Sequence, residues 1–198
     1  MPNSRDIAAI RDLARRYADV CAEDVQQERR DLWRRHNSLQ HTRPLVYVRW
    51  FACRREITDR ELVCEDPFFR GHENNLRQFL FQASIGDDYV LEPWLTQQAS
   101  LVTPPDGLWG PKIGHIPSTE PRGAWMFDPP IRDIEDASKL VVPRHIVDEE
   151  ATSRNLARLQ DAVGDIIDIA LDRAPAWRVW AADISTYLAQ LRGLEQMM

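Results

Sequence analysis

The chain has 198 residues, of which 43% are hydrophobic, and its 31 acidic and 25 basic side chains give a formal net charge of -6. This hydrophobic share can bury a core and excludes a disordered polar tail. The acidic balance argues against a broad electrostatic surface for DNA or RNA. Only Lys112 and Lys139 are lysines, so arginine supplies almost all of the positive charge. Either genome composition or the binding of carboxylates and phosphates explains this bias.

No apolar run approaches the roughly 18 residues that a membrane span needs. The N-terminus has no apolar signal core. Three cysteines at irregular spacing, Cys21, Cys53 and Cys64, suit reduced thiols better than a disulfide framework. We therefore expect a cytoplasmic protein.

The first 43 residues carry apolar side chains at the three-and-four spacing of a helix, from Ile7 to Val25. Arg43-Pro44 is expected to end the helical region, because a residue before proline disfavours helix. Leu45–Val48 follows as a short β-branched and aromatic run. It predicts a strand buried on both faces of a parallel sheet.

Leu76 to Ala83 predicts a second helix that stops at Gly86, and Tyr89–Leu91 predicts a second strand. Seven prolines and four glycines between Pro104 and Pro130 then disfavour regular structure. Large rings are rare in solvated linkers. We therefore expect this surface excursion to be ordered by its aromatic side chains over a pocket or another subunit. These are Trp109, Trp125 and Phe127.

Asp148-Glu149-Glu150 predicts the start of a strong helix, because the positive end of the helix dipole lies at the N-terminus and favours carboxylates there. Ile166–Leu171 and Arg178–Ala181 are candidate strands. An apolar stripe from Ile184 to Met198 predicts a last helix. We see no stop signal after Met197, so the chain is expected to be cut in mid-helix.

The sequence lacks the common motifs for metal, nucleotide or serine hydrolase sites, such as Cys-x-x-Cys, Gly-x-Gly-x-x-Gly and Gly-x-Ser-x-Gly. Arg49, Arg54 and Arg55 stand just beyond the carboxyl end of the first predicted strand, where ligands of parallel α/β folds bind. A guanidinium there can hold a carboxylate or phosphate, although the spacing alone fits a solvated surface cluster better. Glu92, after the second predicted strand, is either an acid or base or a structural carboxylate.

Five motifs follow one another along the chain: Glu28-Arg29-Arg30; Thr42-Arg43-Pro44-Leu45-Val46; Pro129-Pro130-Ile131 with Asp136, Leu140 and Pro143; the helix Glu149–Gly164 ending in Val163-Gly164-Asp165; and Leu191-Arg192-Gly193-Leu194-Glu195. In order and spacing they resemble the uroporphyrinogen decarboxylase superfamily, which includes the decarboxylase and the methylcobamide:coenzyme M methyltransferases. The resemblance covers most of the chain.

The resemblance implies an α/β fold, the N-terminal part of a (β/α)8 TIM barrel with its small-molecule site at the carboxyl ends of the strands. Such a barrel needs more than 198 residues, so residues 1–198 are expected to be a single, truncated domain. Its expected parts are a helical lead-in (1–43), the first strand–helix units (44–103), the proline-rich excursion (104–147) and a further helix–strand–helix (148–198).

The resemblance also implies roles for individual residues. The decarboxylase has two arginines, four apart, after its first strand, which fall here on Arg49 and Cys53, with Arg54 beside the latter. The family's tyrosine near the middle of the chain falls on Ala189 rather than Tyr187, which counts against porphyrinogen decarboxylation itself. In the methyltransferase branch, a His-x-Cys and a distant Cys hold zinc in a later part of the barrel that this sequence does not contain.

We therefore expect an enzyme acting on an anionic small molecule, by decarboxylation or corrinoid-dependent methyl transfer. Arg49 and Arg54 would bind carboxylates and Glu92 would relay protons. No cofactor is expected within this chain, and the 198-residue piece alone would be inactive. Zinc and a corrinoid protein partner would belong to a full-length methyltransferase, and neither nucleic acid nor membrane is an expected partner. The alternative is a non-catalytic binding or assembly protein on the same barrel, and either protein could form a homodimer.

Overall fold

The computed structural model describes residues 3–50, 62–102, 107–120, 123–143, 146–174 and 184–197. The chain is mixed α/β and divides into two compact units. Unit 1 combines Met1–Gln97 with Arg154–Leu171, and unit 2 combines Gln98–Ser153 with Asp172–Met198. None of the described helices is long and apolar enough to cross a membrane.

The helical lead-in consists of two helices, α1 (Ser4–Cys21) and α2 (Asp24–Asn37). The buried stripe of α1 follows the predicted spacing and includes Ile10, Ala14 and Tyr17. The predicted end of the helical region at Arg43-Pro44 is wrong, because α2 already ends at Asn37. Leu39 takes a positive φ of 56°, and the Gln40 N–H donates to the Arg35 carbonyl (3.0 Å), which satisfies a terminal helix carbonyl.

Helix α4 (Pro67–Ile85) confirms the second predicted helix. The Asp66 side chain caps its first turn by accepting from the Phe68 N–H, and Gly86 ends it in the left-handed region, with φ 75°. Helices α1 and α4 pack together. The wholly buried Asp6 carboxylate of α1 accepts from the N–H groups of Glu65 and Asp66, which fixes the chain entering α4.

The predicted buried strand Leu45–Val48 is wrong. These residues form no strand, and Val46 and Tyr47 are exposed. The N–H groups of Val46 and Val48 donate to the side chains of Asp88 and Asp87 rather than to a neighbouring strand. The apolar sequence of this run does not reveal that aspartate side chains, rather than a neighbouring strand, accept its backbone N–H groups.

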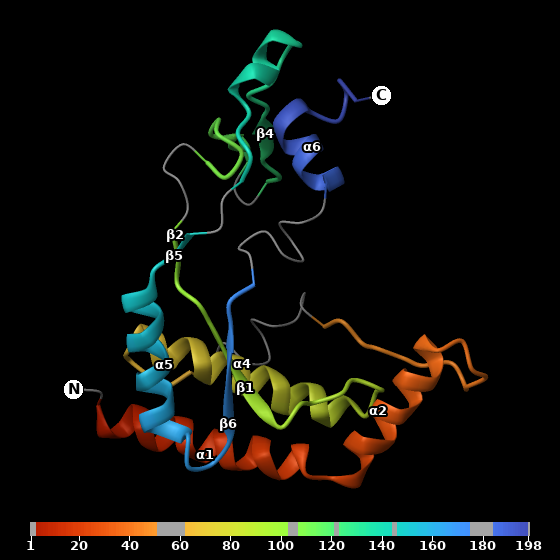
Figure 1. Ribbon diagram of the computed structural model, residues 1–198, viewed down its shortest axis with the longest axis vertical. Helices are drawn as coiled ribbons and strands as arrows, with labels where there is room; N and C mark the ends of the chain where they lie inside the picture. The colour runs from red at the N-terminus through yellow and green to blue at the C-terminus, as the bar shows by residue number, and fades with distance from the viewer. Residues whose placement is uncertain are drawn as a thin grey trace. The chain divides into compact units, whose positions relative to one another are not determined.

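The predicted strand Tyr89–Leu91 is also wrong, because the Leu91 N–H donates to Gln26 Oε1 (2.9 Å). Strand β1 forms a few residues later, at Trp94–Gln98, with Leu95 and Gln97 buried. The predicted strand Ile166–Leu171 is confirmed as β6 (Asp168–Asp172), which pairs with β1. The two strands lie side by side and run in the same direction (Figure 1).

Helix α5 (Glu149–Val163) confirms the helix predicted after Asp148, whose side chain accepts from the Ala151 N–H. Leu159 and Val163 of α5 join α1, α4 and β1 in the core of unit 1. The remaining members of that core are Leu13, Cys21, Cys64, Phe69, Leu76, Leu91, Leu95, Ala162 and Ile167, besides Ile10, Ala14 and Tyr17.

Unit 2 contains two short antiparallel strand pairs, β2 (Leu101–Val102) with β5 (Ile146–Val147), and β3 (Gly114–Ile116) with β4 (Met126–Asp128). The β3–β4 pair lies inside the proline-rich stretch in which we predicted no regular structure. Unit 2 also has a 3-10 helix, Glu135–Lys139.

Helix α6 (Ile184–Arg192) confirms the last predicted helix, but its expected lack of a stop is wrong. Gly193 has φ 88°, and its N–H donates to the Ala189 carbonyl (2.9 Å), so the helix ends there. The predicted strand Arg178–Ala181 lies outside the described residues.

Candidate functional site

Arg49 lies exposed on an extended stretch of unit 1 that we call the arginine segment, residues 43–50. Arg54 and Arg55 lie outside the described residues, so Arg49 is the one residue of the predicted anion site that the structure describes. The arginine segment is bonded to the turn that follows α4, at Asp87 and Asp88. This turn therefore determines where Arg49 lies.

Asp88 bonds to two residues of the arginine segment, Arg43 and Val46. Its carboxylate accepts two hydrogen bonds from the Arg43 guanidinium (2.8 and 2.5 Å) and one from the Val46 N–H (2.8 Å). Its own N–H donates to the Val46 carbonyl (2.8 Å). The Arg43 hydrogen bonds lower the pKa of the Asp88 carboxyl to about 2, so it is ionised at neutral pH.

Asp87 and Gln82 hold the other end of the arginine segment. Asp87 Oδ2 accepts from the Val48 N–H (2.8 Å) and from Gln82 Nε2 (2.7 Å). Gln82 Oε1 accepts from the Trp50 indole N–H (2.7 Å). Arg49 thus has an anchored residue on each side of it.

Glu92, the predicted proton relay, is bound by an arginine of α2. Its Oε2 accepts from Nε and Nη2 of Arg30 (3.1 and 3.0 Å), and Arg30 also donates to the Leu91 carbonyl. The Glu92 backbone carbonyl accepts from the Tyr17 hydroxyl (2.9 Å) and the Cys21 thiol (3.3 Å). Burial raises the pKa of both the Tyr17 phenol and the Cys21 thiol, so both are neutral donors. These bonds suit a structural carboxylate, the alternative that the sequence left open, and the proton-relay role of Glu92 stays a prediction.

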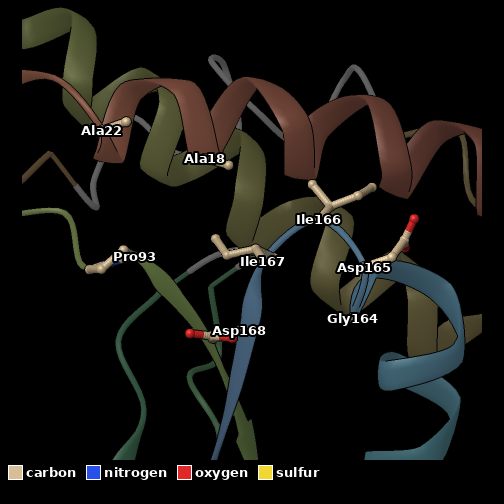
Figure 2. Close-up of a pocket in the computed structure, with 8 residues that line it drawn as sticks. All are labelled: Ala18, Ala22, Pro93, Gly164, Asp165, Ile166, Ile167 and Asp168. Carbon is tan, nitrogen blue, oxygen red and sulfur yellow. The ribbon is translucent and has the colours of Figure 1, made fainter.

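A cavity of about 330 Å³ in unit 1, which sequence reasoning missed, lies where α1 ends and β6 begins (Figure 2). Small side chains, Ala18 and Ala22, leave room for it, and Asp165 and Asp168 supply carboxylates at its wall. Asp165 is held by Arg11 at 2.7 and 2.6 Å, and these bonds lower its pKa. The cavity adjoins the amino end of β6, whereas barrel ligands bind at the carboxyl ends.

A second pocket, of about 710 Å³, lies within unit 2 between β4 and α6. Met126 and Phe127 of β4 line it together with Trp125, which precedes the strand, and Ala189 and Leu194 line it from the helical side. Trp125 and Met126 are about half exposed or more, at 52% and 63%. Of the motifs in the sequence, only the aromatic content of 104–130 pointed to this pocket.

Aromatic contacts accompany the described part of the proline-rich stretch, as the sequence led us to expect. Across the β3–β4 pair, the ring centroid of His115 lies 4.5 Å from that of Trp125 and 5.3 Å from that of Phe127. The ring centroids of Trp109 and Tyr187, the latter on α6, lie 5.6 Å apart. A position over a barrel mouth or a subunit contact stays a prediction.

In the described ranges, no three His, Cys, Asp or Glu side chains cluster so as to hold a metal ion. Cys21 and Cys64 are buried free thiols, and burial raises the pKa of Cys64 to about 12. Comparisons of the chain with protein-family models, with curated proteins and with solved structures give no match.

Proposed function

We propose that the chain is the N-terminal part of a uroporphyrinogen decarboxylase-like (β/α)8 barrel that acts on an anionic small molecule. The ordered motifs from Glu28 to Glu195 support this proposal. The arrangement of β1 and β6 also supports it, because neighbouring strands with the same direction, the second entered from a helix, are the repeating feature of such barrels (Figure 1).

Arg49 is the residue on which the proposal rests most directly. A guanidinium can bind a carboxylate through two parallel hydrogen bonds, and it keeps its charge at every physiological pH. Arg49 is exposed on a segment whose backbone is fixed by hydrogen bonds at Val46 and Val48. In the proposal Arg49 and Arg54 bind substrate carboxylates and Glu92 relays protons.

The reaction has two branches in the proposal. In decarboxylation, the arginines orient a substrate carboxylate and an acid supplies the proton that replaces the lost CO2. In methyl transfer, a corrinoid protein would be a partner and zinc would be held by residues outside this chain. The departure at Ala189 favours a reaction other than porphyrinogen decarboxylation itself.

Titration of the protein with uroporphyrin, a tetrapyrrole with eight carboxylates, tests the anion site by calorimetry. Arg49→Ala should weaken binding by about 1.5 to 3 kcal/mol, roughly 10- to 150-fold, because it removes charged hydrogen bonds. Arg49→Lys should recover only part of the loss, because an ammonium lacks the planar fork. Arg16→Ala, which removes another exposed arginine, is the matched control and should bind normally.

Equal affinities of the wild-type protein and Arg49→Ala would place the anion site elsewhere. No binding by the wild-type protein would contradict an anionic tetrapyrrole ligand for this chain.

A non-catalytic binding or assembly protein is the second candidate function, and the exposed apolar pocket between β4 and α6 favours it. If assembly depends on that pocket, Trp125→Ser with Met126→Ser should abolish self-association in light scattering. The same pair of substitutions should leave the Arg49-dependent titration unchanged under the enzyme proposal.

A further inference from the structure

Arg49 stands between two neighbours that are anchored by different donors. On one side, the backbone N–H of Val48 donates to Asp87 Oδ2 at 2.8 Å. On the other side, the indole N–H of Trp50 donates to Gln82 Oε1 at 2.7 Å. The backbone of Arg49 is therefore fixed from both directions.

A single buried amide joins these two anchors. The Nε2 group of Gln82 donates to the same Asp87 oxygen at 2.7 Å, while its Oε1 receives the Trp50 N–H. Gln82 is 6% exposed and Asp87 is 8% exposed, so water competes little for these bonds. Because Gln82 belongs to the last turns of α4, the helix transmits its own position to both neighbours of Arg49.

Ring packing fixes the indole as well. The rings of Trp50 and Phe81 meet edge to face, with their centroids 4.7 Å apart. Phe81 precedes Gln82 on α4, so the helix supplies both the apolar and the polar contact of Trp50.

Ring contacts supply part of this attachment, at Trp50 and at Tyr47, whose ring centroid lies 5.1 Å from that of Tyr89. Val46 and Val48 remain 55% and 37% exposed, so these two residues are held by polar bonds instead. Bonds of that kind fix the direction of a chain more than they add to its stability, because each replaces a bond to water. A carboxylate-binding guanidinium needs such a fixed direction, since bidentate pairing tolerates small displacements only.

We propose that Gln82 is a positioning residue for Arg49, acting through Val48 and Trp50 to hold the guanidinium where it binds the carboxylate of the substrate. This inference rests on the proposed function, in which Arg49 binds an anionic ligand. It adds a residue that neither the family resemblance nor the sequence pattern identifies.

The test combines Gln82→Met with Gln78→Met as the matched control. Gln82→Met keeps the length of the side chain and removes its hydrogen bonds to Trp50, to Asp87 and to the Val48 carbonyl (3.5 Å). Gln78 lies one turn earlier on α4 and bonds to Asn74 of the same helix. Gln82→Met should speed hydrogen exchange of the Val48 amide about tenfold and weaken uroporphyrin binding about 3- to 10-fold. Gln78→Met should change neither.

A double-mutant cycle separates positioning from general stabilisation. In the Arg49→Ala background, Gln82→Met should cause less than a twofold further loss of affinity, because the side chain it positions is gone. Trp50→Phe provides a second route if Gln82→Met folds poorly. It keeps a ring for Phe81, removes the indole donor, and should give the same coupling to Arg49.

Each outcome decides between the two proposals. If Arg49→Ala weakens binding but neither Gln82→Met nor Trp50→Phe is coupled to it, the inference is wrong and the anion site stands. Unchanged exchange at Val48 together with unchanged affinity would likewise overturn the inference. If the wild-type protein binds no uroporphyrin, or if Arg49→Ala binds normally, the proposed anion site fails, and the role of Gln82 fails with it.

Discussion

Two adjacent carboxylates, Asp87 and Asp88, do for the arginine segment what a neighbouring strand does in a sheet. They accept the N–H groups of Val48 and Val46, two residues apart along an extended chain. The Arg43 bonds keep the pKa of Asp88 near 2. Because this value lies below that of the unfolded chain, the contribution of Asp88 to stability is present at neutral pH. It disappears as the pH falls from about 4 to about 2.

His72 of α4 titrates in a different range. Its Nε2 lies 3.0 Å from Gln97 Oε1, and burial lowers its pKa below the ordinary value of 6.5. The folded protein thus takes up a proton at His72 less readily than the unfolded chain does. Stability should therefore be full above about pH 6.5 and fall as the pH drops towards 5.

We predict that His72→Gln removes this decline, because glutamine does not titrate and can still bond to Gln97. Urea unfolding at pH 7, 6 and 5 tests this prediction: the free energy of unfolding should fall less with decreasing pH in His72→Gln than in the wild-type protein. His36→Gln, near the end of α2, serves as the control and should keep the wild-type slope. An undiminished pH dependence in His72→Gln would show that other groups cause the decline.

At the scale of elements, helices were predictable and strands largely were not. The spacing of Ile10, Ala14 and Tyr17 repeats over several turns and can arise only from a helical face, and the ends of α4 carry recognisable caps. Strands are short here, and their partners are distant in sequence. Leu45–Val48 looks like a strand but is held by aspartates, whereas β1 places the polar Gln97 inward, where it meets His72.

Gly71, inside α4, and Gly86, at its C-terminal cap, should show opposite changes in the free energy of unfolding when each is replaced by alanine. An added Cβ meets no atom within 4 Å at either Gly71 or Gly86, so packing does not distinguish them. Gly86 has φ 75°, where a Cβ is strained, and Gly86→Ala should lower the free energy of unfolding by about 1 kcal/mol or more. Gly71 lies inside the helix, and Gly71→Ala should raise it by about 0.5 to 1 kcal/mol.

Urea denaturation of both variants measures this difference. Shifts of the same sign would mean that the end of α4 is not held by the conformation of Gly86.

For the molecule as a whole, the sequence predicted a mixed α/β chain. It singled out Arg49 from its position after a strand that does not form, and it did not reveal the network around this residue. Asp87, Gln82 and Trp50 come together only because the end of α4 meets the arginine segment, more than 30 residues away along the chain. No short motif encodes such a meeting. Glu92 was identified from its position after a predicted strand, whereas its contact with Arg30 depends on the packing of α2.

The sheets of the described residues have two strands each, so β1 and β6 both have an open edge there. Open edges invite pairing with another chain until further strands cover them. We therefore predict that this 198-residue chain self-associates, with an apparent mass in light scattering that rises with concentration. A monomer at all concentrations, with a single cooperative melt, would argue against a barrel that needs further strands.

The division of unit 1 into two separated stretches also affects its synthesis. Ribosomes add roughly 5–20 residues per second, so Arg154–Leu171 is complete about 4 to 15 s after Gln97 has been added. During that interval Leu159 and Val163 are not yet in place against the apolar faces of α1 and α4. The nascent chain thus carries a temporary binding surface for chaperones, and slower translation would prolong its exposure.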